Sequence, residues 1–334
     1  MKVLDATNQA IEALLKAGLK SFRLDSYTDS SAYFESAICE FGSSATINKK
    51  LINARNKALL NTDSSKRNLI PYEWPVNLEL ADDAVCGLCG TMMYIHEQCY
   101  GKKWVRCLEC NLLKYFPSES ELLQLNQGEP EGAKFPASSL VHLRESFFCN
   151  LFIDELDWNS VLLYGAGWSL VPKWLTDKGI YAVGCDLWQP LIDERRAAWG
   201  NKSYFHRDEL PSISFQLISA FEVFEHFLNP YKDVKRLVKH LSVEGAIIGC
   251  TDFWYGGSLL QHPSNDKSYW KHRTHVTAWS FPSMRYLAKV FDLSVSFFKV
   301  DTPGFGAKVF FVFYRGESVA TFVENLPKVF HNAF

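Results

Sequence analysis

A short apolar run that ends in a glycine turn constrains this chain most. Residues 161–170 read VLLYGAGWSL, which predicts a buried strand, a tight turn and the start of a helix. Asp186 closes a second apolar run, residues 181–186, nineteen residues after the second glycine of the turn. Such a turn lets backbone N–H groups approach a ligand, and an acid at the end of the neighbouring strand accepts hydrogen bonds from ribose hydroxyls. The pair predicts an α/β fold with a pocket for an adenosine-containing cofactor.

The residues around the turn narrow the choice of cofactor. A dinucleotide site needs a third small residue at the sixth position of its G-x-G-x-x-G/A motif, where this chain has Leu170, and Trp168 is bulky beside the turn. The phosphate-binding GxxxxGK[ST] loop is also absent from the sequence. S-adenosylmethionine carries no phosphate and suits a shorter G-x-G turn, so it is the predicted cofactor.

The segments that follow continue the alternation of strands and helices. Residues 215–221 and 243–252 predict two more buried strands, with EVFEHFLNP and an amphipathic helix between them. With the later segment YWKHRTHVTAWSFPSMRYLAKVF, these stretches resemble the class I S-adenosylmethionine-dependent methyltransferases, in particular the group whose fourth strand ends in E-V-L-E-H. The resemblance covers roughly residues 150–315. It implies a Rossmann-like sheet of seven strands whose last hairpin is antiparallel.

The resemblance also implies which residues contact the cofactor. Gly165, Ala166 and Gly167 would line its methionyl side, Asp186 the ribose and Asp208 the adenine edge. The full implied set lies at or near strand ends: Gly165, Ala166, Gly167, Asp186, Leu187, Asp208, Phe221 and Glu222.

Two positions depart from the family pattern. Leu163 stands where the family usually has an acid, and Ser169 where it usually has a third glycine. Serine is small enough for the turn, but the missing acid removes a polar anchor near the methionine end of the cofactor. A non-catalytic binding protein that keeps the fold is therefore an alternative.

The side chains after the strand at 215–221 are the first candidates for acid–base chemistry. Glu222, Glu225 and His226 are spaced so that a helical turn would place them on one side. Two neighbouring carboxylates would stabilise the imidazolium form of His226 and let it act as a base near neutral pH. The alternative is a histidine that only caps or packs the start of a helix.

A second candidate cluster is the polar and aromatic run at residues 269–275. In the resembling group this loop lies over the acceptor pocket, which implies that His275, and less directly Tyr269, reaches the acceptor. The alternative is an aromatic lid that excludes water without titrating.

Four cysteines upstream predict a metal site. Cys86, Cys89, Cys107 and Cys110 form two C-x2-C knuckles separated by seventeen residues, a spacing typical of structural zinc. Cys99 and His96 lie between the knuckles and fit worse as ligands. Two disulfides are the rival reading, but nine cysteines and no secretory segment argue against it. The knuckles resemble the N-terminal zinc module of some sugar and polysaccharide-biosynthesis methyltransferases, and some ribosomal RNA methyltransferases carry one too.

The charge balance bears on the acceptor. Lys and Arg total 35 against 37 Asp and Glu, which disfavours a partner bound through phosphates. The knuckle region carries a small basic patch with aromatic residues among it: Tyr100, Lys102, Lys103, Trp104, Arg106 and Lys114. We expect a small-molecule or glycan-like acceptor, such as a nucleotide sugar or a natural-product intermediate. RNA is the alternative.

The 334 residues divide into four predicted parts. Residues 1–75 are a helical N-terminal extension, 76–136 the zinc-ribbon module, 137–316 the methyltransferase domain and 317–334 a C-terminal tail. Helical periodicity is seen at 6–19, 30–41, 47–60 and 140–156. No run approaches the roughly eighteen apolar residues of a membrane span, and no cleaved signal is visible, so we expect a cytoplasmic protein.

Overall fold

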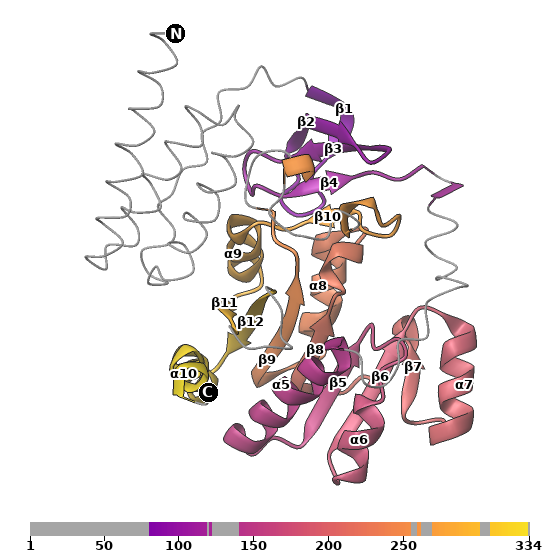
Figure 1. Cartoon of the computed structure of the whole chain (residues 1–334), viewed down its shortest axis with the longest axis vertical. Coiled ribbons are helices and arrows are strands. Elements are labelled where there is room, and N and C mark those ends of the chain that lie inside the picture. Colours follow the sequence, from indigo (N-terminus) through magenta and orange to yellow (C-terminus); the bar gives the residue numbers. More distant parts are fainter. Residues whose placement is uncertain are drawn as a thin grey trace.

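The computed structural model describes residues 80–118, 120–121, 140–254, 259–261, 269–300 and 308–332. The helices predicted within residues 6–60 lie outside these ranges. The described residues build two β-sheets, a small one above a larger one in the view of Figure 1, with helices around the larger sheet.

The small sheet is antiparallel and carries the cysteine knuckles. Its order is β1-β2-β3-β4-β10, formed by β1 (Leu80–Val85), β2 (Met92–Cys99), β3 (Lys102–Arg106), β4 (Leu113–Tyr115) and β10 (Thr277–Ala278). Strands β2 and β3 are joined by Tyr100 and Gly101, which both have positive φ, as a tight two-residue hairpin turn requires. Strand β10 comes from far along the chain and pairs with β4, so the small sheet includes part of the predicted methyltransferase domain (Figure 1).

The larger sheet has the strand order β11-β12-β9-β8-β5-β6-β7. Its strands are β5 (Ser160–Tyr164), β6 (Tyr181–Asp186), β7 (Tyr204–His206), β8 (Phe215–Phe221), β9 (Leu241–Thr251), β11 (Ser294–Lys299) and β12 (Val309–Arg315). Strands β5 to β9 are parallel, and β12 is antiparallel to both β9 and β11. Continuous apolar runs form the parallel strands because helices cover both faces.

The order of the parallel strands reverses between β5 and β8. From β5 the chain proceeds through β6 and β7 on one side, and then returns to β8 and β9 on the other. Tyr164 pairs with Cys185 in register, so the residues after β5 and β6 emerge together at one edge of the sheet. A crevice at the carboxyl ends of strands beside such a reversal is where open α/β sheets bind their ligands.

Six helices with described bounds accompany this sheet: α5 (Leu140–Leu156), α6 (Val171–Asp177), α7 (Gln189–Trp199), α8 (Pro230–Lys239), α9 (Phe281–Val290) and α10 (Glu317–Asn332). Two have clear start signals, since Asn229 accepts a hydrogen bond from Lys232 N–H and Ser280 forms a capping box with Ser283. None of the helices in the described ranges combines the length and hydropathy that a bilayer crossing demands.

The helices pack in two hydrophobic cores on opposite faces of the sheet. One core contains apolar side chains of α5, α6 and α10, including Phe148, Val171 and Val319. The other contains Leu237 of α8 and Leu287 of α9 together with three of the four knuckle cysteines. The tail helix α10 is therefore part of the fold, and the cysteine module shares a core with the larger sheet.

Candidate functional site

The glycine turn and the acid converge as their positions predict. Gly165 and Gly167 have φ of 67° and 50°, a region that L side chains rarely adopt. The Gly167 N–H donates to Oδ2 of Asp186 over 3.0 Å, and the Ala166 N–H donates to the Cys185 carbonyl over 3.0 Å. The turn thus lies at the carboxyl ends of β5 and β6, beside the reversal of strand order.

The two glycines serve different purposes. A Cβ on Gly165 would lie 2.6 Å from Cγ2 of Val223, so the turn packs tightly on the residues after β8. A Cβ on Gly167 would meet only the Gly165 carbonyl at 4.0 Å, so this side of the turn is open. The neighbouring Trp168 has its ring beside the Arg195 guanidinium of α7, 5.3 Å from the ring centroid. The bulky Trp168 side chain therefore lies beside α7.

The Asp186 carboxylate shapes the loop after β6. Its Oδ1 accepts hydrogen bonds from the N–H groups of Leu187 (2.7 Å) and Trp188 (3.1 Å), while Oδ2 accepts from Gly167. An ionised carboxylate offers about four acceptor sites, so one is left for a further donor such as a ribose hydroxyl. Leu187, an expected cofactor contact, lies half-buried with its N–H directed to this carboxylate.

Two other expected cofactor contacts have different surroundings. Asp208 is half-exposed in a 3₁₀ turn and forms ion pairs with Arg207 (3.2 Å) and Arg236 (3.3 Å). Burial opposes its ionisation, but these pairs still lower its pKa. Phe221 is buried, and its ring packs near Phe148 in the α5 core, so only its backbone is available at the strand end.

Glu222 corrects one expectation. It has a φ of 53° and precedes the 3₁₀ turn Phe224–His226, so Glu222, Glu225 and His226 do not share a helical turn. Its Oε2 pairs with Lys308 Nζ at 3.1 Å, and Lys308 also pairs with Asp252 at 2.9 Å. Burial raises the pKa of Glu222 to about 7, against the opposing effect of Lys308.

The structure brings His226 and His275 together. Their ring centroids lie 4.7 Å apart, although the two residues belong to segments far apart in the sequence. Two hydrogen bonds hold these segments: Val276 N–H donates to the Glu225 carbonyl (2.9 Å), and His226 Nδ1 bonds the Thr274 carbonyl (3.2 Å). The Glu225 carboxylate is fully buried beside the two imidazoles.

His275 and Tyr269 are both held in buried positions. Burial lowers the pKa of His275, and the nearby His226, His272 and Lys102 lower it further, so its imidazole is neutral. The Tyr269 ring lies 4.3 Å from the His275 ring. Its hydroxyl bonds Thr251 Oγ1 (2.9 Å) and accepts from the Asp252 N–H (3.1 Å), while burial raises its pKa.

The basic side chains of the knuckle region do not form the surface patch that the sequence predicts. Lys102, Arg106 and Lys114 are buried, and Trp104 is fully buried beside them. Arg106 Nε donates to Asn111 Oδ1 (2.9 Å) within the knuckle itself. Sequence alone could not show this, because burial of a lysine depends on acceptors contributed by distant segments.

Lys102 and Lys114 hold the segments that carry the histidines. Lys102 Nζ donates to the carbonyls of Trp270 (3.2 Å), His272 and His275 (2.8 Å). Lys114 Nζ donates to the Phe227 carbonyl (2.9 Å) and to Thr277 Oγ1 (3.0 Å). Burial lowers the pKa of Lys102 to about 8 and that of Lys114 to about 7. Each lysine stem starts from the small sheet, which therefore positions the loop over the larger one.

Glu145 of α5 is a residue that the sequence analysis missed. Its fully buried side chain accepts hydrogen bonds from the hydroxyls of Ser169 (2.8 Å) and Ser219. Burial raises its pKa, which the two hydroxyl donors oppose. Ser169 belongs to the glycine turn, so Glu145 anchors this turn from α5. No motif in the sequence marks it.

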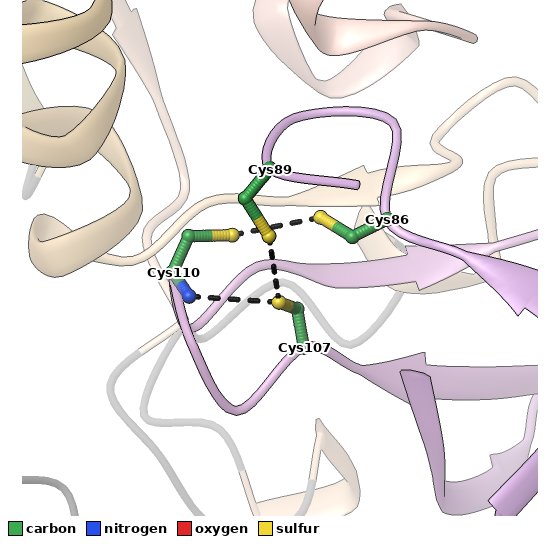
Figure 2. A group of neighbouring side chains, drawn as sticks. All are labelled: Cys86, Cys89, Cys107 and Cys110. Carbon is green, nitrogen blue, oxygen red and sulfur yellow. Dashed lines mark hydrogen bonds between the residues drawn. The ribbon is translucent and has the colours of Figure 1, made fainter. Parts of the chain in front are cut away.

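The four cysteines form one cluster between the knuckles (Figure 2). Their sulfurs lie within 4.8 Å of one another; Cys86 Sγ is 3.5 Å from Cys110 Sγ, and Cys89 Sγ is 3.3 Å from Cys107 Sγ. A tetrahedral site with metal–sulfur bonds of about 2.3 Å has sulfur–sulfur edges of about 3.8 Å, close to these distances. The donor set therefore fits zinc.

Each knuckle turn contains a residue with positive φ. Gly90 and Asn111, each directly after the second cysteine of its pair, have φ of 79° and 57°. The Cys86 N–H donates to the Thr91 carbonyl and the Cys107 N–H to the Leu112 carbonyl, which closes both turns. Cys99 lies in a separate hydrophobic cluster with Trp104 and does not belong to the four-sulfur group.

Comparisons with known proteins give structural neighbours only. No protein-family model matches the chain, and no curated protein matches it. The solved structures include the plantazolicin methyltransferase BpumL with a desmethyl analogue and S-adenosylhomocysteine (13% identity, TM-score 0.43, 59% of this chain and 95% of that chain). They also include the Burkholderia thailandensis 1,6-didemethyltoxoflavin-N1-methyltransferase (11% identity, TM-score 0.44, 72% of this chain and 100% of that chain). A third is the bacterial CtHen1-C methyltransferase domain (18% identity, TM-score 0.37, 54% of this chain and 100% of that chain). At these scores the likenesses assign no activity by themselves.

Proposed function

We propose that this chain transfers a methyl group from S-adenosylmethionine to a small-molecule or glycan-like acceptor. The larger sheet is then a Rossmann-like class I methyltransferase sheet. The proposal depends on one observation: the Gly167 N–H and the Asp186 carboxylate meet at 3.0 Å where the order of the parallel strands reverses.

Each part of this edge has a role toward the cofactor. The open side of Gly167 lets the backbone approach the methionyl group, and the remaining acceptor site of Asp186 takes a ribose hydroxyl. Glu145 keeps the turn in place through Ser169. Leu170, the N-cap of α6, stands where a dinucleotide motif has its third small residue, which favours a cofactor without phosphates.

The group formed by Glu225, His226 and His275 is placed to act on the acceptor. When bound, the cofactor supplies an electrophilic methyl carbon. An acceptor that carries a proton on its reacting atom would lose that proton to a base in this group. His226 Nδ1 forms a hydrogen bond with the Thr274 carbonyl, so the lone pair of this imidazole is on Nε2.

Zinc in the four-cysteine cluster would have a structural role. Four thiolates close a tetrahedral site and leave no position for a substrate. The module then supports the active site indirectly, through Lys102 and Lys114.

Methyl transfer to different acceptor pools tests the proposal. The full chain is incubated with methyl-labelled S-adenosylmethionine and either a low-mass metabolite extract or total RNA. We expect label in the low-mass fraction, strongly reduced in Asp186→Asn and kept in the exposed control Asp193→Asn. Label in RNA would support the RNA alternative instead. No label, together with no binding of S-adenosylhomocysteine, would support a non-catalytic protein.

A further inference from the structure

A second group of potential metal ligands lies apart from the cysteine cluster. One ligand atom each from Glu225, His226 and His275 lies within 4.8 Å of the others. Glu225 and His226 come from the 3₁₀ turn after β8, and His275 comes from the loop before β10. Two imidazoles and one carboxylate are a common ligand set for first-row divalent metals.

Two members of this group lack the partners that buried polar atoms normally have. Among the described residues, neither carboxylate oxygen of Glu225 accepts a hydrogen bond, and His275 Nδ1 has no partner either. Glu225 is fully buried and His275 is nine-tenths buried. An unpaired buried carboxylate is costly, and coordination to a cation is one of the two usual ways of offsetting that cost.

The third member is oriented as metal-binding histidines usually are. His226 Nδ1 lies 3.2 Å from the Thr274 carbonyl, which can only accept, so Nδ1 carries the proton. The lone pair of the ring is then on Nε2, the nitrogen with which His226 would bind a metal. A backbone carbonyl on the other ring nitrogen is a common way of fixing a metal-binding imidazole.

The charges around the group leave room for a cation. Three acids gather here: Glu225, Glu222 and Asp252. Lys308 forms ion pairs with Glu222 (3.1 Å) and Asp252 (2.9 Å). Lys102 is directed to the backbone carbonyls of the histidine loop. Among the described residues, no lysine or arginine forms an ion pair with Glu225, and Lys308, which acts on it electrostatically, is already paired with the other two acids.

We propose that Glu225, His226 and His275 bind a first-row divalent cation such as Mn²⁺. Three protein ligands leave coordination positions for water and for an oxygen atom of the acceptor. The site lies next to the glycine turn, because Val223, two residues before Glu225, packs against Gly165. The role of the cation toward the acceptor rests on the proposed methyl transfer, whereas its binding does not. With the cation bound, the two histidines are ligands and not proton acceptors.

Retention of Mn²⁺, measured by electron paramagnetic resonance, tests the site. Mn²⁺ is added to the full chain carrying one equivalent of zinc, which the four thiolates take up in preference to a site of two imidazoles and a carboxylate. We expect about one Mn²⁺ bound per chain, and at least tenfold weaker binding in Glu225→Gln and His275→Asn. His272→Asn, which changes an exposed imidazole of the same loop outside the ligand group, should bind Mn²⁺ as the unchanged chain does.

The outcomes separate this inference from the proposed function. No bound Mn²⁺ in the unchanged chain, or equal binding in Glu225→Gln and His275→Asn, would overturn the site. Calorimetry with S-adenosylhomocysteine on the same samples checks folding and the cofactor pocket. Mn²⁺ bound through these residues without S-adenosylhomocysteine binding keeps the metal site and removes the methyltransferase. S-adenosylhomocysteine binding without bound Mn²⁺ keeps the cofactor pocket and removes the metal site.

Discussion

Single residues in unusual backbone conformations mark the edge of the sheet where the proposed chemistry takes place. Gly165, Gly167 and Glu222 all have positive φ at the ends of β5 and β8. Such conformations persist where the surrounding structure holds them, and they gather at functional sites. The two glycines could be predicted, because the turn motif demands them. Glu222 could not, since nothing in its identity distinguishes it from a helical glutamate.

Gly165→Ala tests how closely the turn is packed. The new Cβ would lie 2.6 Å from Val223 and would also adopt an unfavourable φ, so we expect a loss of about 2–4 kcal/mol in unfolding free energy. Gly179→Ala is the matched control, because Gly179 has a φ of 84° and open space around it, and it should lose only about 1 kcal/mol. Urea unfolding measures both variants. Equal losses would show that the contact with Val223 has no cost of its own.

At the scale of elements, local patterns predicted the larger sheet far better than the small one. The helix expected at 140–156 and the strand expected at 215–221 have those bounds in the structure. Long apolar runs specify them without help from distant residues. Strands β4 and β10 have only three and two residues; β4 pairs with β3 on one side, and β10 has β4 as its strand partner. Pairing across that sequence distance leaves no local pattern.

Lys114 of β4 makes this pairing dependent on pH. Its pKa is lowered by burial to about 7, from 10.5 in an exposed lysine, so the unfolded chain binds more protons between these values. Stability should therefore rise with pH from about 7, by about 2 kcal/mol up to pH 9 from this residue. Lys114→Met removes this contribution. The cysteine thiols are present in both the variant and the unchanged chain, so the comparison isolates the lysine. Urea unfolding at pH 7 and pH 9 should show a smaller rise for Lys114→Met, and an identical rise would contradict a neutral buried lysine.

At the scale of the whole molecule, the cysteine module and the sheet with the glycine turn act as one unit. Three knuckle cysteines share a hydrophobic core with the larger sheet, and Lys102 of the module binds carbonyls of the loop that carries His275. The sequence predicted both the cysteine cluster and the turn because each is a compact motif with fixed spacing. It could not predict their connection, nor the group of Glu225, His226 and His275, since these depend on contacts between segments far apart in the chain.

Cys107→Ser tests the module's role. We expect loss of bound zinc and of several kcal/mol of stability, because binding of a structural metal adds directly to folding free energy. Methyl transfer should fall more than affinity for S-adenosylhomocysteine, since the loop with His275 loses its support. Cys99→Ser, which changes a buried cysteine outside the cluster, should keep its zinc. Zinc content by chelator assay and thermal unfolding check this, and full stability of a zinc-free Cys107→Ser chain would contradict a structural metal.

Calorimetric titration of the full chain with S-adenosylhomocysteine tests the central claim most directly. We expect one site per chain, weakened about tenfold to a hundredfold in Asp186→Asn, because a hydrogen bond to a charged carboxylate is worth about 1.5–3 kcal/mol. Asp193→Asn on the exposed side of α7 should bind as the unchanged chain does. Absence of binding in the unchanged chain, or equal affinity in Asp186→Asn, would contradict a cofactor held between the glycine turn and Asp186.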